Sequence, residues 1–338
     1  MPQSITFQES FPATLSGLRN EIERIAVDLC DWAVFDPDSR EFLLKSENRR
    51  FRQRFYREFT IPKKSGGERH ITAPVGYLKG AQKALSILLG TLYEAPEMVN
   101  GFTAGRSVGT NAEAHVRKNY VFNTDLKDFF PSITARMVRH ALEDLGVKPE
   151  VARYISVLCT ITTEGDDLPE DVLPQGSPAS PVLSNIVCRN MDRHIDWLAR
   201  KYGVTYTRYA DDMTMSSMHS VYGKNSTFLK EFRDIISGYG FTVNEAKTRL
   251  QKKGSRQEVT GIIVSDRANV CRKYIKNLRA EIFHMEMEGF SKEQCRSVRG
   301  KVAFVGMVRG KDDPMYCRLL SRIRSIKGRP EGFLSQAH

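Results

Sequence analysis

The spacing of apolar residues along the chain predicts helices and strands in a mixed order. Apolar residues recur with a helical period in five stretches and again after Arg272: 15–33, 76–94, 135–145, 180–203 and 226–237. Short extended or alternating runs predict strands near 121–125, 204–215, 241–244 and 259–264, and a hairpin over 59–74. From residue 119 onward the order is strand, helix, helix, hairpin, helix, strand. This split β-α-β pattern predicts an α+β domain whose antiparallel sheet is backed by two helices.

Capping residues indicate where two of these helices begin. Thr134 precedes the 135–145 stretch and is expected to be its N-cap, with Gly146 as the stop signal. Ser180, which is followed by Pro181, is expected to cap the next helix. A carboxylate at a strand end ahead of a helix, as Asp125 is, occupies the place where open α/β sheets bind ligands.

Three aspartates lie at the ends of predicted strands. Asp125 ends one strand, and Asp211 and Asp212 lie at the tip of the following hairpin. Neighbouring residues on a strand point to opposite faces, so only a tight turn would bring the two hairpin acids together. Like charges held that close repel one another unless a divalent cation lies between them. An Asp-Asp pair in a turn is more often a solvated corner, so the pair alone does not establish a metal site.

The composition describes a globular chain with an excess of positive charge. Its length of 338 residues is enough for two or three domains with a sizeable core. Its residues are 41% hydrophobic and 27% charged, as in an ordinary globular protein. The net charge is +11, and residues 270–338 carry 15 Lys and Arg against 7 Asp and Glu. Such a basic surface favours a nucleic-acid partner, although a solvated helical surface would show the same pattern. The sequence has neither a run of about 18 apolar residues nor a secretory signal, so we expect a cytoplasmic protein without membrane contact.

Two polar loops could bind phosphate. The 59–74 hairpin carries Lys63, Lys64 and Arg69 near a Ser-Gly-Gly turn, and could close over a triphosphate, although a solvated turn is the simpler interpretation. A glycine-rich loop over 101–110 precedes a helix start but lacks the G-x-x-x-x-G-K-[ST] pattern of a nucleotide P-loop.

The three acids and the segments around them resemble the motifs of reverse transcriptases. Three carboxylates gathered on one sheet are what two-metal phosphoryl transfer requires. The matching motifs occur along the chain in the same order as in the family, and they cover roughly residues 50–265. In this chain they are the 59–74 hairpin, Asn-Thr-Asp125-Leu-Lys-Asp-Phe-Phe130-Pro-Ser, Leu-Pro-Gln175-Gly-Ser-Pro-Ala-Ser-Pro, Tyr209-Ala-Asp211-Asp212, and Gly240-Phe-Thr-Val-Asn-Glu-Ala-Lys247-Thr.

The resemblance implies a right-hand polymerase fold with fingers, a ferredoxin-like (RRM-like) palm and a helical thumb. It assigns residues 1–118 to an N-terminal helix and fingers, and residues 119–265 to the palm, with fingers and palm interleaved around 147–175. Residues 266–338 would be the basic thumb. Two Mg²⁺ ions per active site would be the cofactors, bridged by Asp125 and Asp211, with Asp212 supporting the geometry or contacting one ion.

The resemblance also implies roles in nucleotide binding. Lys63 or Lys64, together with Arg69, would hold the triphosphate. Gln175 would line the nucleotide pocket. Phe130 occupies the position of the family's steric gate, where a planar ring leaves no room for a 2′-OH; simple core packing is the alternative. Lys247 could protonate the departing pyrophosphate or be an ordinary surface lysine.

Two short signatures narrow the resemblance to retron reverse transcriptases. Asn111-Ala-Glu-Ala-His115 fits the pattern N-A-x-x-H, and Val259-Thr260-Gly261 fits V-T-G. The resemblance implies that a cognate noncoding RNA is both template and primer, that priming uses an RNA 2′-OH, and that dNTPs yield an RNA–DNA product in antiphage defence with a separate effector protein. The expected RNA contacts are the two signatures, at Asn111, His115, Val259, Thr260 and Gly261, and the thumb residues Arg318, Arg322 and Arg324.

Two other functions are compatible with the sequence. One is a different bacterial defence or group II intron-like reverse transcriptase, with another RNA template or a repetitive or untemplated product. The other is a noncatalytic RNA-binding protein that kept the fold, against which the intact Asp125, Asp211 and Asp212 argue. The acidic stretch Glu164–Asp171 has no explanation in either scheme.

Overall fold

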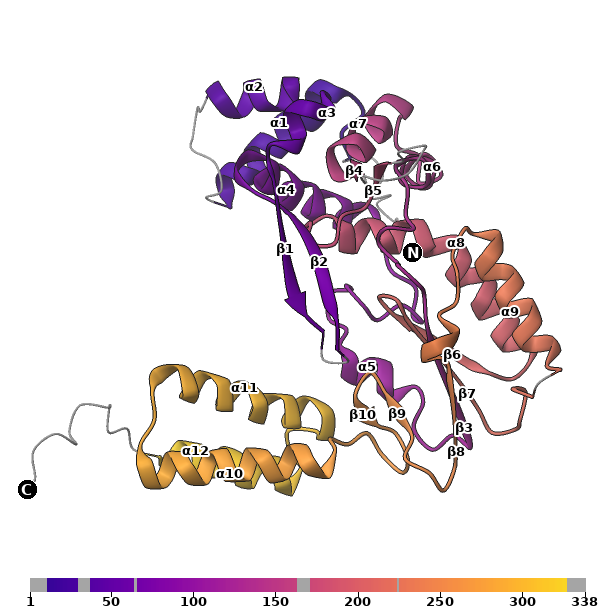
Figure 1. The fold of residues 1–338 in the computed structure, drawn as a ribbon, viewed down its shortest axis with the longest axis vertical. Coiled ribbons are helices and arrows are strands. Elements are labelled where there is room, and N and C mark those ends of the chain that lie inside the picture. Colours follow the sequence, from indigo (N-terminus) through magenta and orange to yellow (C-terminus); the bar gives the residue numbers. More distant parts are fainter. Residues whose placement is uncertain (1–10, 30–36, 64–65, 163–170, 224, 327–338) are drawn as a thin grey trace, which may run out of the picture.

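The computed structural model describes residues 11–29, 37–63, 66–162, 171–223 and 225–326 (Figure 1). Helices gather at one end, a mixed sheet-and-helix layer lies in the middle, and a small helical bundle projects from it. Two hydrophobic cores hold these parts together, a large one and a smaller one. Among the described residues, no helix combines the length and apolarity needed to cross a membrane.

The first part of the chain forms a helical layer from which a hairpin extends. Its hairpin pairs β1 (Tyr56–Pro62) with β2 (Glu68–Pro74), antiparallel along its full length, which confirms the hairpin predicted over 59–74. Lys64 lies outside the described residues. The helices of this layer are α1 (Leu15–Asp28), α2 (Pro37–Lys45), α3 (Arg49–Gln53), α4 (Gly76–Leu92) and α7 (Pro149–Cys159).

A four-stranded antiparallel sheet forms the centre of the molecule. The strand order is β6-β7-β3-β8, and all its pairs are antiparallel, as the split β-α-β pattern predicts of the sheet. Helices α8 and α9 lie together beside the sheet, and α8 contacts both α9 and β6 (Figure 1). The elements are β3 (Tyr120–Asp125), α6 (Ala135–Glu143), α8 (Ser180–Lys201), β6 (Thr205–Tyr209), β7 (Asp212–Ser217), α9 (Thr227–Gly238) and β8 (Arg249–Lys252).

Alternation along the strands divides the sheet into two faces. Phe122, Met213 and Met215 belong to the large core, on the face that α8 and α9 cover. The intervening residues Asn123, Asp125, Asp212 and Thr214 point to the other face, because neighbouring strand residues alternate. The three expected acids therefore lie at the edge of the polar face.

Three local predictions differ from the structure. Thr134 caps α6 as expected, but Ser180 is the first residue of α8, and its hydroxyl donates to the Pro174 carbonyl. Within the described residues, the predicted strand over 241–244 makes a single antiparallel bridge, between Val243 and Leu126, just beyond the end of β3. A 3₁₀ turn, Glu245–Lys247, follows.

The predicted strand over 259–264 is a hairpin instead. Thr260 and Gly261 both have positive φ, 46° and 84°, which forms a two-residue turn between β9 (Glu258–Val259) and β10 (Ile262–Ile263). A short pair, β4 (Ile161–Thr162) with β5 (Asp171–Val172), completes the strands of the described residues.

The C-terminal helices form a bundle around the smaller core. This core also takes in Ala112 of α5 (Val108–Glu113) and Val121 of β3, so it joins residues from all three predicted domains. The boundaries at 118 and 265 stay a prediction. The bundle helices are α10 (Arg272–Glu288), α11 (Lys292–Arg309) and α12 (Pro314–Ser325).

Candidate active site

The turn between β6 and β7 presents two of the three acids. Tyr209 pairs with Asp212, so Ala210 and Asp211 form a two-residue loop, and Ala210 has φ of 59°. A positive φ at the first loop residue matches the twist of a hairpin and is unfavourable for alanine. Gly101 lies directly against this turn: a Cβ built on it would be 2.2 Å from the Ala210 nitrogen. Only glycine permits this approach.

The third acid faces this turn across the sheet. Asp125 and Asp212 are directly opposite in the β3–β7 register, where side chains on one face lie closest. The Leu126 amide donates to the Asp211 carbonyl at 3.1 Å, which joins the end of β3 to the turn. The tight turn thus places Asp211 and Asp212 close enough to Asp125 for their charges to interact.

The charges of these acids disfavour one another. Burial raises the pKa of Asp212 to about 6, helped by the negative charges of Asp211 and Asp125. Burial, followed by the charge of Asp125, also raises the pKa of Asp211. The cluster therefore holds more negative charge than its surroundings compensate, which is the condition that a bound cation relieves.

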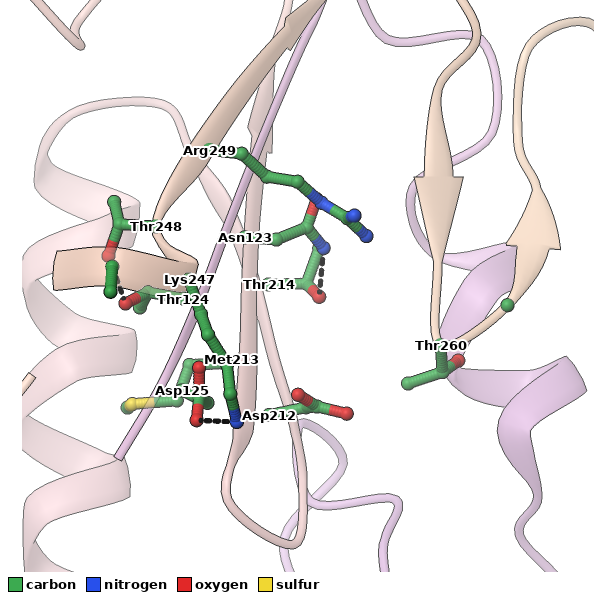
Figure 2. Close-up of a pocket in the computed structure, with 12 residues that line it drawn as sticks. Asn123, Thr124, Asp125, Asp212, Met213, Thr214, Lys247, Thr248, Arg249 and Thr260 are labelled. Atoms are coloured by element: carbon green, nitrogen blue, oxygen red, sulfur yellow. Dashed lines mark hydrogen bonds and ion pairs between the residues drawn. The ribbon is translucent and has the colours of Figure 1, made fainter. Parts of the chain in front are cut away.

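Lys247 reaches into this cluster. Its ammonium donates to Asp125 Oδ2 at 2.7 Å, and the Asn244 amide donates to the same oxygen at 3.3 Å. This hydrogen bond raises the pKa of Lys247. The side chain of Lys247 is 63% exposed and that of Asp125 only 5%, so the lysine can leave the site while the aspartate stays (Figure 2).

The donor set suits magnesium. Among the described residues, no three acidic, histidine or cysteine side chains are arranged to hold a metal by themselves. Magnesium does not require this, because it binds one or two carboxylates and completes its octahedron with water and substrate phosphates. Asp125, Asp211 and Asp212 supply oxygen ligands in a site of excess negative charge, so they fit the ion.

A pocket beside the acids' end of the sheet is lined by Phe130, the residue expected to be the steric gate. A cavity of about 430 Å³ is lined by Phe130, Phe102, Lys79 and the loop Gly176–Pro178, among others. The Phe102 and Phe130 rings are 6.2 Å apart. Phe130 is half-buried at the edge of the large core, so it combines packing with a position on the pocket wall.

The loop that carries Gln175 is fixed to the β1–β2 hairpin. The backbone carbonyl of Gln175 accepts a hydrogen bond from the Thr72 backbone amide at 2.9 Å. Gly176 has φ of 133°, and a Cβ there would lie 2.8 Å from Ile71 Cγ2. Lys63 and Arg69 are exposed on the same hairpin. The positive charge of Arg69 offsets a small part of the rise in the pKa of Asp211.

A polar cleft leads away from the acids. Its volume is about 490 Å³, and Figure 2 shows it between the central sheet and the β9–β10 turn. Asn123 and Thr214 hydrogen-bond across its sheet side at 3.1 Å, and Arg249 extends into it. Thr260 and Gly261 line the far side of the cleft.

The other signature residues are too buried for the RNA contacts expected of them. His115 and Val259 have no exposed surface, and Asn111 is 1% exposed. Asn111 Nδ2 and Thr260 Oγ1 are 3.5 Å apart, so the two signatures contact each other. In this conformation their burial leaves almost no surface for direct contact with RNA. Asn111 instead contacts the β9–β10 turn, and His115 contacts strands β6 and β7.

The three thumb arginines differ in their surroundings. Arg322 forms a bidentate ion pair with Glu286, whereas Arg318 donates to the Pro314 carbonyl and makes no ion pair within the part of the chain that the structure describes. Arg324 is exposed and, with Arg299, lines a cleft of about 260 Å³ between α11 and α12. Arg324 therefore has more freedom to contact RNA than Arg322.

Two functional candidates were missed from the sequence. Arg208 and Asp192 form a fully buried ion pair behind the Ala210–Asp211 turn between β6 and β7, hereafter the catalytic turn because it carries a candidate catalytic acid. Each is a charged residue on an otherwise apolar face, Arg208 beside Val204 and Tyr206, and Asp192 beside Met191 and Ile195. Such a residue on each of two elements is the signal that could have indicated the pair.

Comparisons with known proteins agree with these motifs. Residues 61–278 match the family model for reverse transcriptase (RNA-dependent DNA polymerase). Retron Mx65 reverse transcriptase of Myxococcus xanthus is 38% identical over 82% of this chain and 66% of its own length. Retron Mx162 reverse transcriptase of the same organism is 34% identical over 75% and 57%, and retron Ec86 reverse transcriptase of Escherichia coli is 33% identical over 80% and 81%.

The chain thus spans 66% and 57% of the two Myxococcus relatives, and 81% of the Escherichia coli relative. The family match covers well over half of this chain and contains Asp125, Asp211 and Asp212. The chain belongs to the reverse transcriptase family, and within it to the retron reverse transcriptases.

Proposed function

We propose that this chain is an Mg²⁺-dependent, RNA-directed DNA polymerase of the retron type. The observation that carries the proposal is the pairing of Asp125 with Asp212 on one face of the sheet, with Asp211 in the adjoining turn. The polar cleft and the Phe130 pocket supply space for a nucleic-acid strand and a nucleotide near this turn.

In this proposal Asp125 and Asp211 hold two magnesium ions, and Asp212 maintains the geometry or contacts one of them. When bound, the ions would activate the attacking hydroxyl and stabilise charge on the phosphates. Asp125 can take up this role once Lys247 moves away, which its exposure permits. A displaced Lys247 would lose the hydrogen bond that raises its pKa. It would still carry a proton to the departing pyrophosphate, because the ordinary pKa of lysine, about 10.4, lies well above neutral pH.

The nucleotide would be bound between the hairpin and the sheet. Arg69 and Lys63, with Lys64, would contact the triphosphate as charged donors. Gln175 would line the pocket through the loop that Thr72 fixes. The Phe130 ring would lie under the sugar and exclude a 2′-OH, which favours dNTPs over ribonucleotides.

The partners are proposed from the family assignment. A cognate noncoding RNA would serve as template and, through a 2′-OH, as primer, so that the product is an RNA–DNA molecule. The exposed arginines of the bundle, Arg318 and Arg324, would contact this RNA. A role in antiphage defence would require a separate effector protein.

The test is to purify the protein from its native locus and to sequence the nucleic acid that copurifies. We expect one structured RNA joined to a short complementary DNA, and the same RNA without DNA from the double variant Asp211→Asn/Asp212→Asn. DNA of simple repeats would contradict the retron assignment but keep the polymerase. Complementary DNA in equal amount from the double variant would contradict the catalytic assignment.

A further inference from the structure

An ion pair with no exposed surface lies behind the catalytic turn. Arg208 on β6 and Asp192 on α8 are both 0% exposed. Arg208 Nε donates to Asp192 Oδ1 at 2.8 Å, and Nη2 donates to Oδ2 at 2.7 Å. The Tyr206 hydroxyl also donates to Asp192 Oδ1, at 2.8 Å. The carboxylate is therefore held by three donors from one strand.

The rest of the guanidinium reaches the catalytic turn. Arg208 Nη1 donates to the Ala210 carbonyl at 3.0 Å, and Nη2 also donates to Asn185 Oδ1 at 3.1 Å. The Ala210 carbonyl belongs to the peptide that joins Ala210 to Asp211. Its orientation therefore sets the direction in which the Asp211 backbone leaves the turn, and with it the position of the carboxylate.

The opposite side of the turn is held by the 98–101 segment. The Arg208 amide donates to the Met98 carbonyl and the Asn100 amide donates to the Arg208 carbonyl, both at 2.8 Å. Asn185 donates to the Gly101 carbonyl at 2.9 Å, and Gly101 abuts the Ala210 nitrogen. The turn is thus fixed on two sides, and Asn185 joins both supports.

Stability alone does not account for a pair of this kind. Burying two charges has a large desolvation penalty, and well-packed apolar residues of similar volume are often as stable or more stable. A planar, bidentate donor that also reaches a backbone carbonyl instead gives geometric precision. The strained φ of Ala210, 59°, is the kind of backbone geometry that needs such support.

We propose that Arg208, oriented by Asp192, is a positioning residue that holds the Ala210–Asp211 peptide and so places the Asp211 carboxylate for polymerisation. The proposal rests on the proposed function, because it concerns the same site. Arg208 touches neither nucleotide nor primer in this assignment, and acts through the turn.

The test separates positioning from stability. Single substitutions leave a buried charge without its partner and are expected to destabilise the fold. The triple variant Asp192→Leu/Tyr206→Phe/Arg208→Met removes both charges and the hydroxyl that would lose its acceptor. The Ala210 carbonyl and Asn185 Oδ1 also lose a donor, so its urea midpoint should fall, but by less than in the single variants that leave an unpaired buried charge. Under conditions in which it is folded, we expect a kcat at least about tenfold lower, with a higher half-saturating Mg²⁺ concentration and little change in the KM for dNTP.

The matched control is the ion pair between the half-buried Asp196 and the exposed Arg200 on the same helix. Asp196→Leu/Arg200→Met should leave kcat and the Mg²⁺ requirement unchanged. Arg208→Lys provides a second variant that keeps the charge pair, but its single ammonium cannot bind the carboxylate bidentately and also reach the Ala210 carbonyl. Its kcat should therefore be lower than that of the wild type even after correction for the fraction of the variant that is unfolded under the assay conditions.

A triple variant that is folded and has wild-type kcat and Mg²⁺ dependence would overturn the positioning role, as would Arg208→Lys with wild-type kcat. These outcomes leave the proposed function intact, because they require an active wild-type enzyme. A wild type that does not polymerise would instead remove the proposed function.

Discussion

His115 should make the protein less stable below neutral pH. The imidazole has no exposed surface, and both of its nitrogens are hydrogen-bonded at 2.7 Å, Nδ1 with Ser216 Oγ and Nε2 with Thr207 Oγ1. These partners lie on β7 and β6, the two strands of the catalytic hairpin. Burial, with a smaller contribution from the charge of Lys118, lowers the pKa of His115 to about 3.

The size of the effect follows from proton linkage. In the unfolded chain the pKa of histidine is about 6.5, so between about pH 6.5 and 3 the unfolded state binds a proton that the folded state does not. The free energy of unfolding therefore falls as the pH falls through this range. At pH 5 the loss from His115 alone is about 2 kcal/mol relative to pH 8, since each pH unit contributes about 1.4 kcal/mol.

The perturbation is His115→Gln, which keeps one donor and one acceptor for the two hydroxyls but does not titrate. Urea unfolding, monitored by circular dichroism at pH 8 and at pH 5, gives the difference in the free energy of unfolding between the two pH values for each variant. The wild type should lose about 2 kcal/mol more than His115→Gln over this interval. The control His140→Gln, at an exposed histidine, should keep the wild-type loss. Equal losses for the wild type and His115→Gln would refute the buried, neutral imidazole.

Three further outcomes test other parts of the site. Phe130→Ala should admit ribonucleotides, seen as a ratio of ribonucleotide to deoxynucleotide incorporation at least about tenfold higher than in the wild type, since about 1.4 kcal/mol of discrimination is lost; an unchanged ratio would leave Phe130 with core packing only. Gly176→Ala should raise the KM for dNTP and lower stability by about 1–3 kcal/mol, because its Cβ meets the β1–β2 hairpin; wild-type values would show that the loop adapts. Arg324→Gln should weaken RNA binding and flatten its salt dependence by close to one ion in a filter-binding titration, whereas Arg322→Gln, whose wild-type side chain is paired with Glu286, should change the slope less; equal slopes would place the RNA elsewhere.

Local signals were sufficient where chain neighbours determine the structure. The β1–β2 hairpin follows from its Ser-Gly-Gly turn, and the α6 start follows from the Thr134 hydroxyl, which accepts from the Met137 amide. The three acids were found because each lies at a strand end or in a hairpin turn, in a pattern that resembles a known family. Their register, Asp125 opposite Asp212, then follows from the fold.

The features that the sequence does not reveal concern contacts between distant segments. The burial of His115 is one, because Thr207 and Ser216, which enclose it, follow 92 and 101 residues later. The apolar run over 259–264 predicts a single strand, whereas the Thr260-Gly261 pair, with positive φ at both residues, turns the segment back on itself. The Arg208–Asp192 pair becomes visible only when α8 is known to contact β6.

The most direct measurement is primer extension on an RNA template with dNTPs and Mg²⁺, comparing the wild type with Asp125→Asn. The matched control is Asp128→Asn, an exposed acid of the same motif whose positive φ of 45° asparagine tolerates. We predict complementary DNA from the wild type and from Asp128→Asn, and a rate at least about a hundredfold lower from Asp125→Asn, which corresponds to about 2.7 kcal/mol of transition-state stabilisation. Extension by Asp125→Asn at the wild-type rate would contradict the assignment of catalysis to these carboxylates.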